Sequence, residues 1–385
     1  MTAISIIGWL CLAPAAIGTA YMLGAAAAVV RFFASASPFS PSSAAVTILK
    51  PLYGAEPRLI DNLGTFLAQD HDGPIQLLLG VQREDDPAIA AVEEVRRRHP
   101  QARIDVVVDQ TPHGSNGKVA NLINLEGHIA HNIVVLSDSD MAVPPFYLAE
   151  LIAALDRPRV GAVTCLYRGR GDAGFWSKLG AAGLSYQFLP NATFATAIGQ
   201  IGDACMGSTI ALRRATLEAA GGFAAFADIL ADDHALGQAI RAQGLDIVIP
   251  PMLLTHGSDE TSLTELWRHE LRWAATVRGL TPALAYAGSL ITFPLPLAMI
   301  GALFHPAAGI ALALVALTTR IVVAGVVDTV ARASTVSKWL LPARDFLSLA
   351  IFVASYATRS VDWRGMRLTM GPDGRIAAET ESQGR

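Results

Sequence analysis

The sequence contains few cysteines and few lysines. Its 385 residues include three cysteines, whose spacing fits neither a metal site nor a disulfide framework. Lysine occurs only at positions 50, 118, 178 and 338, so arginine supplies most of the positive charge. The net charge is −4, and the sequence lacks the basic patch or stripe that binds nucleic acid. Nucleic acid is therefore excluded as a partner.

Charged residues are absent from a long stretch near the N-terminus. Ile4–Val30 contains none and is long enough to cross a bilayer as a helix. A cleaved signal peptide is the alternative, since Ala34-Ser35-Ala36 is similar to a cleavage site. No Lys or Arg precedes the apolar run, however, and the run is longer than a signal-peptide core. We therefore predict an uncleaved transmembrane anchor at residues 1–32.

A second uncharged stretch, Gly279–Thr319, lies in the C-terminal part of the chain. We predict membrane helices at about 283–304 and 308–328. Arg320 falls near the middle of the second helix and should face protein or water, because an intramembrane charge is costly. The apolar segment at 346–358 is short for a span, so a re-entrant, interfacial or tilted arrangement remains open.

Basic residues flank these apolar segments. Arg31 follows the first, and Arg359, Arg364 and Arg367 follow the last. By the positive-inside rule, the middle of the chain and the tail at 361–385 lie in the cytoplasm. This requires an even number of crossings after the middle domain, which favours two spans plus an interfacial or re-entrant segment. Three full spans would put the basic tail outside.

Strand and helix patterns alternate between the anchor and the C-terminal membrane region at 279–360. This alternation predicts an α/β, Rossmann-like domain with a mostly parallel sheet at residues 44–278. The candidate strands are 46–49, 75–81, 104–108, 133–136, 160–166 and 208–212, and helical periodicity begins near Pro57, Pro87, Lys118 and Ala231.

Two aspartates follow the fourth candidate strand. Asp138 and Asp140 stand directly after the apolar run Ile133–Leu136, with one residue between them. Ligands bind at the carboxyl ends of strands in open α/β sheets, and hard cations prefer carboxylate oxygens. The pair therefore predicts a Mg²⁺ or Mn²⁺ site for a nucleotide or nucleotide-sugar substrate. The alternative is an ordinary turn, which Asp and Ser also favour.

Other clusters of polar residues occur at similar places. Lys50 ends the first strand, Asp86 follows the second, and Lys118 closes a glycine-rich turn that can meet phosphate. Asp232-Asp233-His234 stands at a helix start. Helix caps at Asp86 and Asp232 and an ordinary loop before Lys118 are the simpler alternatives.

A final cluster, Trp267–Trp273, precedes the C-terminal apolar stretch. Trp and Arg gather at membrane surfaces, so an interfacial belt is one interpretation. The other is that Arg272 supplies a cation for a diphosphate leaving group.

In order, these clusters resemble the membrane-bound inverting glycosyltransferases of the ceramide glucosyltransferase type, within glycosyltransferase family 2. The three aspartate motifs of that family fall at Asp86, Asp138 and Asp233. Its final Q/R-x-x-R-W signature reads His269-Glu270-Leu271-Arg272-Trp273, with His in place of Gln or Arg. Within that group, the chain looks closest to the bacterial hopanoid-biosynthesis-associated glycosyltransferase. Three segments carry this closer likeness, Ala162–Gly169, Gly207–Arg214 and Trp267–Trp273.

The resemblance implies a GT-A catalytic domain that uses a UDP-sugar and a divalent cation, Mg²⁺ or Mn²⁺. The sugar would pass with inversion to a lipid hydroxyl. For the hopanoid branch it would be N-acetylglucosamine transferred to bacteriohopanetetrol, and for the ceramide branch glucose transferred to ceramide. The enzyme would be an integral protein of the bacterial inner membrane with a cytoplasmic catalytic domain.

Residue roles follow from this scheme. Asp233 would be the general base, with Asp232 and His234 as alternatives. Asp138 and Asp140 would hold the cation, while Arg272 and His269 would bind the departing diphosphate. Contacts to the nucleotide would come from Asp86, Lys118 and Lys50, and Trp273 would stack on the acceptor or merely pack.

Two other functions are alternatives to a lipid glycosyltransferase. A processive polysaccharide synthase shares a Q-x-x-R-W-like element but needs more spans, to form a channel. A catalytically silent membrane scaffold of the same fold would be favoured by loss of one of the three aspartates, yet all three are present.

Overall fold

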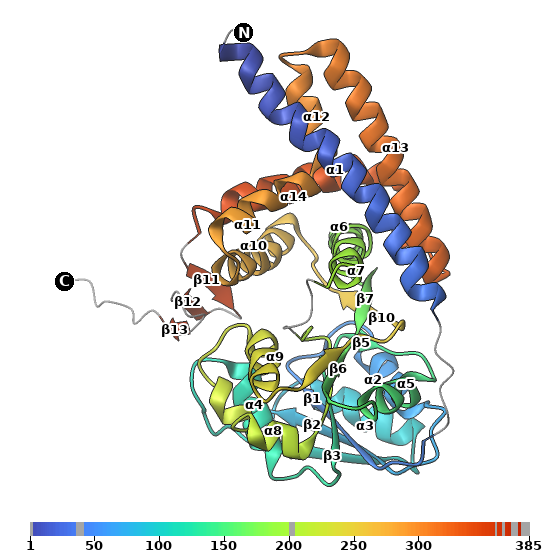
Figure 1. The fold of residues 1–385 in the computed structure, drawn as a ribbon. Coiled ribbons are helices and arrows are strands. Elements are labelled where there is room, and N and C mark those ends of the chain that lie inside the picture. Colours follow the sequence, from blue (N-terminus) through green and yellow to red (C-terminus); the bar gives the residue numbers. More distant parts are fainter. Residues whose placement is uncertain are drawn as a thin grey trace, which may run out of the picture.

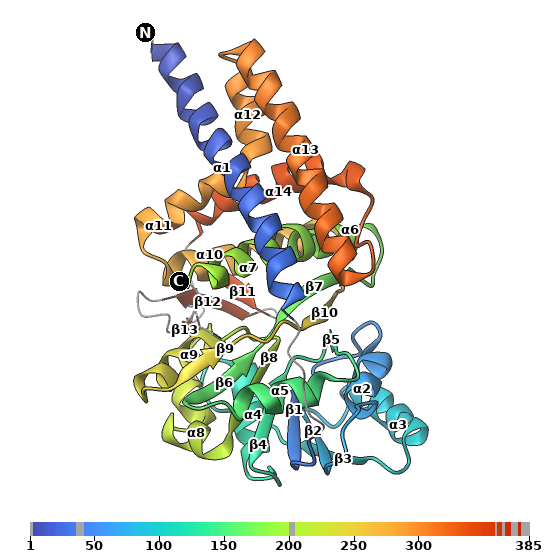
Figure 2. The same cartoon turned by 45° about the vertical axis from the view of Figure 1, so that its right-hand side comes forward.

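A computed structural model describes residues 3–35, 42–199, 205–358, 360–363, 366–370 and 376–378. The described chain forms three stacked parts in both views of the ribbon (Figures 1 and 2). A sheet domain lies at one end, and the long helices α1 (Ala3–Ala34) and α13 (Pro306–Ala331) project from the other. Between these parts lies a layer of shorter helices, which are α6 (Phe175–Gly183), η1 (Leu184–Phe188), α7 (Leu189–Ala197), α10 (Leu263–Leu280), α11 (Ala283–Gly288) and α14 (Leu341–Ser355).

The sheet domain confirms the predicted α/β class. Its main sheet has the strand order β3-β2-β1-β4-β8-β6-β9. The first four of these neighbours run parallel, and β8 is antiparallel to both strands beside it. The strand bounds are β1 Val46–Pro51, β2 Ile75–Val81, β3 Arg103–Val108, β4 Ile133–Ser137, β6 Val160–Thr164, β8 Thr209–Arg213 and β9 Asp246–Val248.

Apolar helices cover both faces of this sheet. One core is shared by the strands with α2 (Leu59–Leu67), α3 (Ala88–Arg98) and α5 (Tyr147–Leu155). The other is shared with α4 (Gly117–Glu126), α8 (Arg214–Ala219) and α9 (Asp232–Ala242). Because both faces are buried, strands such as β4 are nearly continuous apolar runs, as is typical of parallel sheets.

A second, small sheet brings a distant strand to the predicted site. In it β10 (Leu253–Ser258) pairs with β7 (Leu166–Gly171) and with β5 (Met141–Ala142), which directly follows the aspartate pair. His256 is the register partner of Met141 in this sheet. Residues near the start of β5 therefore lie beside residues of β10.

The membrane region has two helices long and apolar enough to span a bilayer, Ser5–Ala34 and Pro306–Ala331. The helix predicted at about 283–304 differs from expectation. Ala283–Thr292 and Pro294–Ala302 (α12) form a pair bent by 77°, and Phe293 separates them. Pro294 lacks an N–H and disfavours helical geometry at the residue before it, so the bend has a local cause.

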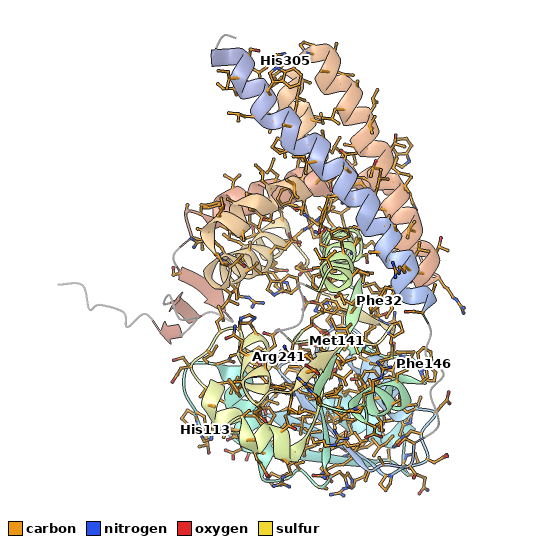
Figure 3. All side chains as sticks on the ribbon, in the orientation of Figure 1. Phe32, His113, Met141, Phe146, Arg241 and His305 are labelled. Carbon is orange, nitrogen blue, oxygen red and sulfur yellow. The ribbon has the colours of Figure 1, made fainter. Side chains whose placement is uncertain are left out.

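Small residues let the projecting helices approach closely, as is usual in membrane proteins. A methyl group at Gly18 of α1 would overlap the carbonyl oxygen of Ile291. At the far end, His305 Nε2 lies 3.0 Å from the Ser5 carbonyl oxygen and its ring lies beside Trp9. Figure 3 shows His305 at this far end and Phe32 at the domain end of α1.

Arg320 faces protein, as predicted. Its side chain is fully buried, and its guanidinium donates to both carboxylate oxygens of Asp345, at 2.6 to 3.0 Å, and to the carbonyl of Tyr186. Asp345 belongs to α14, which covers most of the predicted 346–358 segment and begins before it. This pair therefore ties a spanning helix to the intermediate layer.

The tail predicted at 361–385 is described only in part. The strands β11 (Ser360–Trp363), β12 (Met366–Met370) and β13 (Ile376–Ala378) form a small antiparallel sheet. Arg359, Arg364 and the last residues of the tail lie outside the described residues, as does Ala36 of the cleavage-like sequence.

Candidate active site

The predicted aspartate pair lies at the carboxyl edge of the main sheet, immediately after β4. Lys50, on the neighbouring strand β1, donates from Nζ to the Asp138 carbonyl at 2.7 Å and to Ser137 Oγ at 3.3 Å. Lys50 is completely buried, with its ammonium over the Phe66 ring, and burial lowers its pKa to about 7. The predicted contact of Lys50 with the nucleotide is therefore corrected, because this side chain holds the aspartate loop from beneath.

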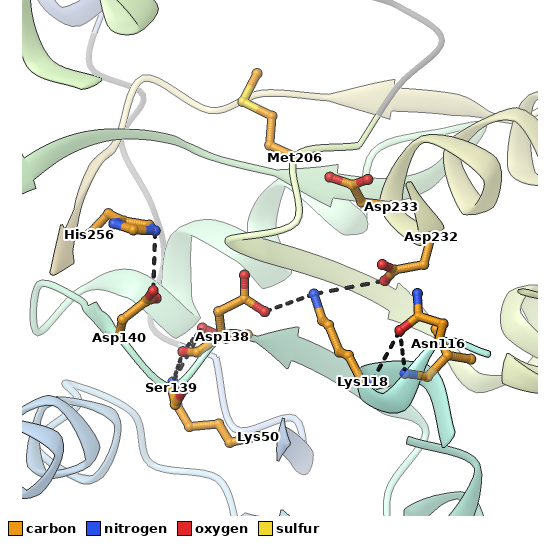
Figure 4. A network of polar contacts seen from close by, with 12 residues as sticks. Lys50, Asn116, Lys118, Asp138, Ser139, Asp140, Met206, Asp232, Asp233 and His256 are labelled. Atoms are coloured by element: carbon orange, nitrogen blue, oxygen red, sulfur yellow. Dashed lines mark hydrogen bonds and ion pairs between the residues drawn. The ribbon is translucent and has the colours of Figure 1, made fainter. Parts of the chain in front are cut away.

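Lys118 bridges two of the predicted acidic motifs. Its Nζ lies 2.8 Å from Asp138 Oδ1 and 3.8 Å from Asp232 Oδ2 (Figure 4). Burial lowers the pKa of Lys118, but the carboxylates of Asp138 and Asp232 outweigh it, so the pKa stands well above its ordinary value. Lys118 is therefore a permanently charged cation at the carboxyl edge of the sheet.

The glycine-rich turn before Lys118 is held against the chain that precedes α9. Asn116 caps α4 by accepting hydrogen bonds from the Lys118 and Val119 backbone N–H groups, and it donates to the Ile229 carbonyl at 2.7 Å. Gly114 has φ +71°, and an added Cβ would lie 2.6 Å from the Ala227 carbonyl oxygen. This close approach explains how residues far apart in sequence bring Lys118 to Asp232.

Asp232 and Asp233 begin α9, but neither caps it. The N-cap position is Ala231, which makes no side-chain capping bond, so the simple cap interpretation of Asp232 is wrong. Asp233 Oδ1 accepts from the His234 N–H at 2.8 Å, and its other oxygen points at Gly207. Burial raises the pKa of both carboxyl groups, and the charge of Lys118 opposes the rise.

Asp86 lies apart from this group, next to the end of β1. Its Oδ1 accepts from the Gly54 N–H at 2.9 Å and from the Ala88 N–H at 2.8 Å. The second bond satisfies an N–H group at the start of α3, although the N-cap position itself is Pro87 and not Asp86. Its predicted contact with a uridine stays a prediction.

Asp140 faces a residue that sequence reasoning missed. Its Oδ2 lies 3.2 Å from Nε2 of His256 on β10 (Figure 4). The other atoms of the pair, Asp140 Oδ1 and His256 Nδ1, are buried and have no hydrogen-bond partner. Burial raises the pKa of Asp140 and lowers that of His256. The sequence signal was a lone imidazole in the stretch Met252–Ser258, which contains no charged residue.

These donors fit a divalent cation that also takes ligands from a substrate. Within the described ranges, no three His, Cys, Asp or Glu side chains form a ready-made metal cage. Mg²⁺, however, is commonly held by one or two carboxylates together with substrate phosphates and water. Asp140 offers an unpartnered oxygen for that purpose, and Asp138 and His256 lie beside it.

The predicted final signature lies on α10 and reaches the same place. His269 Nδ1 lies 2.5 Å from Glu260 Oε1, and the His269 ring packs against Trp273 with centroids 4.4 Å apart. Trp273 also meets the His256 ring edge-on at 6.2 Å. Trp273 thus packs inward, against the interfacial-belt interpretation. Arg272 is partly buried on the same helix, and its diphosphate role stays a prediction.

Comparison with known proteins identifies the family. The pattern of glycosyl transferase family 21 matches residues 10–376. The chain belongs to this family. The motifs had suggested glycosyltransferase family 2, so the family number differs from the expectation. The expected ceramide glucosyltransferase type is confirmed.

Among its relatives are ceramide glucosyltransferases. Ceramide glucosyltransferase 1 of Caenorhabditis elegans is 21% identical over 245 residues, which are 63% of this chain and 52% of that protein. The ceramide glucosyltransferase of Komagataella phaffii is 31% identical over 124 residues, 31% of this chain and 24% of that protein. The chain thus spans about half of the first relative and a smaller part of the second.

A mannosyltransferase of Pyrobaculum calidifontis, solved with GDP-Man and Mn²⁺, is similar at 17% identity with a TM-score of 0.49. The similarity covers 91% of this chain and 98% of that one.

Proposed function

We propose that this protein is an inverting glycosyltransferase that moves a sugar from a UDP-sugar to a lipid hydroxyl at a membrane surface. The observation that carries the proposal is the chain of charges Asp138, Lys118 and Asp232, with Asp233 beside it, at the carboxyl edge of the sheet. This edge faces the helical layer beneath the projecting apolar helices (Figure 1). A water-soluble donor and a membrane-bound acceptor can meet there.

The donor would be held by its charged diphosphate. Lys118 offers an ammonium group, and Asp138, Asp140 and His256 would hold a divalent cation. When bound, that cation supplies positive charge to offset the charge that develops on the departing diphosphate. Arg272 adds charge-assisted hydrogen bonds to the same group. Asp86, next to the ends of β1 and β2, contacts the nucleoside.

Asp233 is the general base in this proposal. Asp232 forms an ion pair with Lys118, which weakens it as a proton acceptor, whereas the Asp233 carboxylate accepts hydrogen bonds from the backbone N–H groups of His234 and Gly207. A buried carboxylate with a raised pKa is a stronger proton acceptor than an exposed one. Asp233 takes the proton of the acceptor hydroxyl while the hydroxyl oxygen attacks the anomeric carbon of the sugar and UDP departs.

Two donor and acceptor pairs fit this chemistry. The resemblance of residues 162–169, 207–214 and 267–273 favours N-acetylglucosamine transferred to bacteriohopanetetrol. The ceramide glucosyltransferases among the relatives favour glucose transferred to ceramide. Both acceptors join hydroxyl groups to an apolar skeleton. We place the enzyme in a bacterial inner membrane with its sheet domain in the cytoplasm.

The test is mass spectrometry of membrane lipids from cells with and without the gene. A hopanoid or sphingolipid that gains the mass of one sugar names both donor and acceptor. Purified protein incubated with UDP-sugar and lipid should release UDP, whereas a silent scaffold releases none. A processive polysaccharide synthase would yield a polymer, and the two or at most three candidate spans of the described chain are too few for its channel.

A further inference from the structure

A cavity of about 280 Å³ lies in the helical layer between the sheet domain and the projecting helices. Its walls come from α6, η1 and α7 on one side and from α10, η3 (Ser289–Thr292) and α14 on the other. One end is apolar and is lined by Val277, Phe293, Ile351 and Phe352. A cavity with an apolar end in this position is accessible to a lipid.

Aromatic side chains connect the wall of this cavity to the catalytic edge. Trp273 lines the cavity and also meets the His256 ring. Phe188 lines it too, and it stacks on Tyr167 with centroids 4.7 Å apart. Tyr167 in turn stacks on His256 at 5.5 Å. The rings of the cavity wall therefore reach the His256 ring of the Asp140–His256 pair, so the cavity adjoins the catalytic edge.

The other end of the cavity is polar and offers donors. Arg344 is 4% exposed and binds Glu270 through both terminal nitrogens, at 2.5 and 2.6 Å. Its Nε is buried and has no hydrogen-bond partner. Gly183, which also lines the cavity, lies against this guanidinium, where an added Cβ would be 3.0 Å from Nε. The Arg344–Glu270 ion pair therefore gives this end of the cavity its polar character.

Two amide side chains also line the cavity. Gln187 Oε1 accepts a hydrogen bond from Ser348 Oγ at 2.8 Å, and this bond does not use the NH₂ group of Gln187. Asn191 lies four residues further along the same helical run and also lines the cavity. Amides at this spacing share one helix face. They can bind neighbouring hydroxyl or amide groups of one ligand.

We propose that this cavity is the acceptor subsite, an inference that rests on the proposed function. It holds the part of an amphiphilic lipid next to the reacting hydroxyl. Gln187 and Asn191 bind polar groups of the lipid, and the apolar end receives the first part of the lipid skeleton. The volume is at the small end for ligand pockets, so the rest of the lipid stays outside the cavity.

The test uses the full-length protein in nanodiscs, with bacteriohopanetetrol or ceramide as the acceptor probe. Val277→Trp fills the apolar end of the cavity. Val315→Trp is the matched control, because Val315 is equally exposed, 54% against 53% for Val277, but lies on α13 outside the cavity. Val277→Trp should raise the KM for the lipid at least about tenfold, well beyond any change in the KM for UDP-sugar. Val315→Trp should raise neither.

Asn191→Leu probes the polar end by removing the amide at similar size. It should raise the lipid KM about 2- to 10-fold through loss of a neutral hydrogen bond. An unchanged lipid KM in both Val277→Trp and Asn191→Leu, in protein that folds like wild type, would overturn the subsite. Wild-type protein that transfers no sugar to either lipid would instead overturn the proposed function.

Discussion

Asp140 Oδ2 lies 3.2 Å from His256 Nε2, although Asp140 is in the turn before β5, His256 is in β10, and the two are far apart in sequence. The contact exists because β10 pairs with β5, the strand that follows the aspartate pair. It adds an imidazole to a site that the sequence described as carboxylates alone. Imidazole nitrogen is a softer ligand than carboxylate oxygen, so the presence of His256 bears on which divalent cation the site prefers.

The first prediction concerns the cation. EDTA should abolish UDP release, and Mg²⁺ or Mn²⁺ should restore it. His256→Ala should raise the cation concentration needed for half-maximal activity by about 10- to 100-fold, because loss of a ligand or of its orienting partner weakens metal binding to that extent. Titration of stripped enzyme with Mn²⁺ measures this. Full activity of wild-type enzyme in EDTA would exclude the metal role.

The second prediction distinguishes the two aspartates of α9. Asp233→Asn keeps size and hydrogen bonding but removes the proton acceptor, and turnover should fall by about 10²–10⁴. UDP-sugar affinity should change little, because the base acts on the acceptor. Asp232→Asn removes a partner of Lys118 and should weaken donor binding instead. Normal turnover at 233 with collapse at 232 would move the base to Asp232.

The third prediction concerns pH. Burial raises the folded-state pKa of Asp233 above the ordinary 3.8. A general base must be deprotonated, so turnover should fall as pH drops through this raised pKa, at higher pH than for an ordinary aspartate. The measurement is the kcat profile below neutral pH. If Asp233 causes the fall in kcat at low pH, that fall should be absent from the residual activity of Asp233→Asn. A fall that persists in this variant would show that another group causes it.

The sequence alone predicted the sheet and the positions of charged residues at the carboxyl ends of its strands. Asp138 and Lys118 were found because each follows a strong local signal, an apolar strand and a glycine-rich turn. His256 was missed because its role depends on strand pairing between distant segments. Lys50 was misjudged because sequence shows that it ends a strand but not that its side chain turns inward under the loop.

The membrane region was harder to predict for a related reason. Hydropathy identified apolar stretches but did not reveal the bend at Phe293, which depends on the geometry that Pro294 imposes. The cavity was also hidden, since Gln187, Trp273 and Arg344 come from three separate helices.

The fourth prediction concerns the buried pair in the membrane region. Arg320→Ala leaves Asp345 as an unpaired buried charge and should destabilise the protein by about 3–5 kcal/mol. The double substitution Arg320→Met with Asp345→Leu removes both charges and should recover much of that loss. Thermal unfolding in detergent measures both. A double variant as unstable as the single one would show that the charges themselves are needed.

The fifth prediction concerns topology. With the sheet domain and tail both in the cytoplasm, a reporter active only in the periplasm and fused after Arg385 should stay silent. The same reporter placed between α12 and α13, near His305, should be active, because that turn lies at the end far from the sheet (Figure 3). A signal from the first fusion would mean an odd number of crossings after the domain.

The Arg320–Asp345 pair also constrains how the chain is made. Arg320 is synthesised 25 residues before Asp345. An arginine at the middle of a membrane helix costs about 2.5–3.5 kcal/mol on insertion, so α13 enters the bilayer with an unmatched charge. That charge is neutralised only when α14 has emerged and packed against it. A chain cut short before residue 345 would therefore lack the carboxylate that neutralises Arg320.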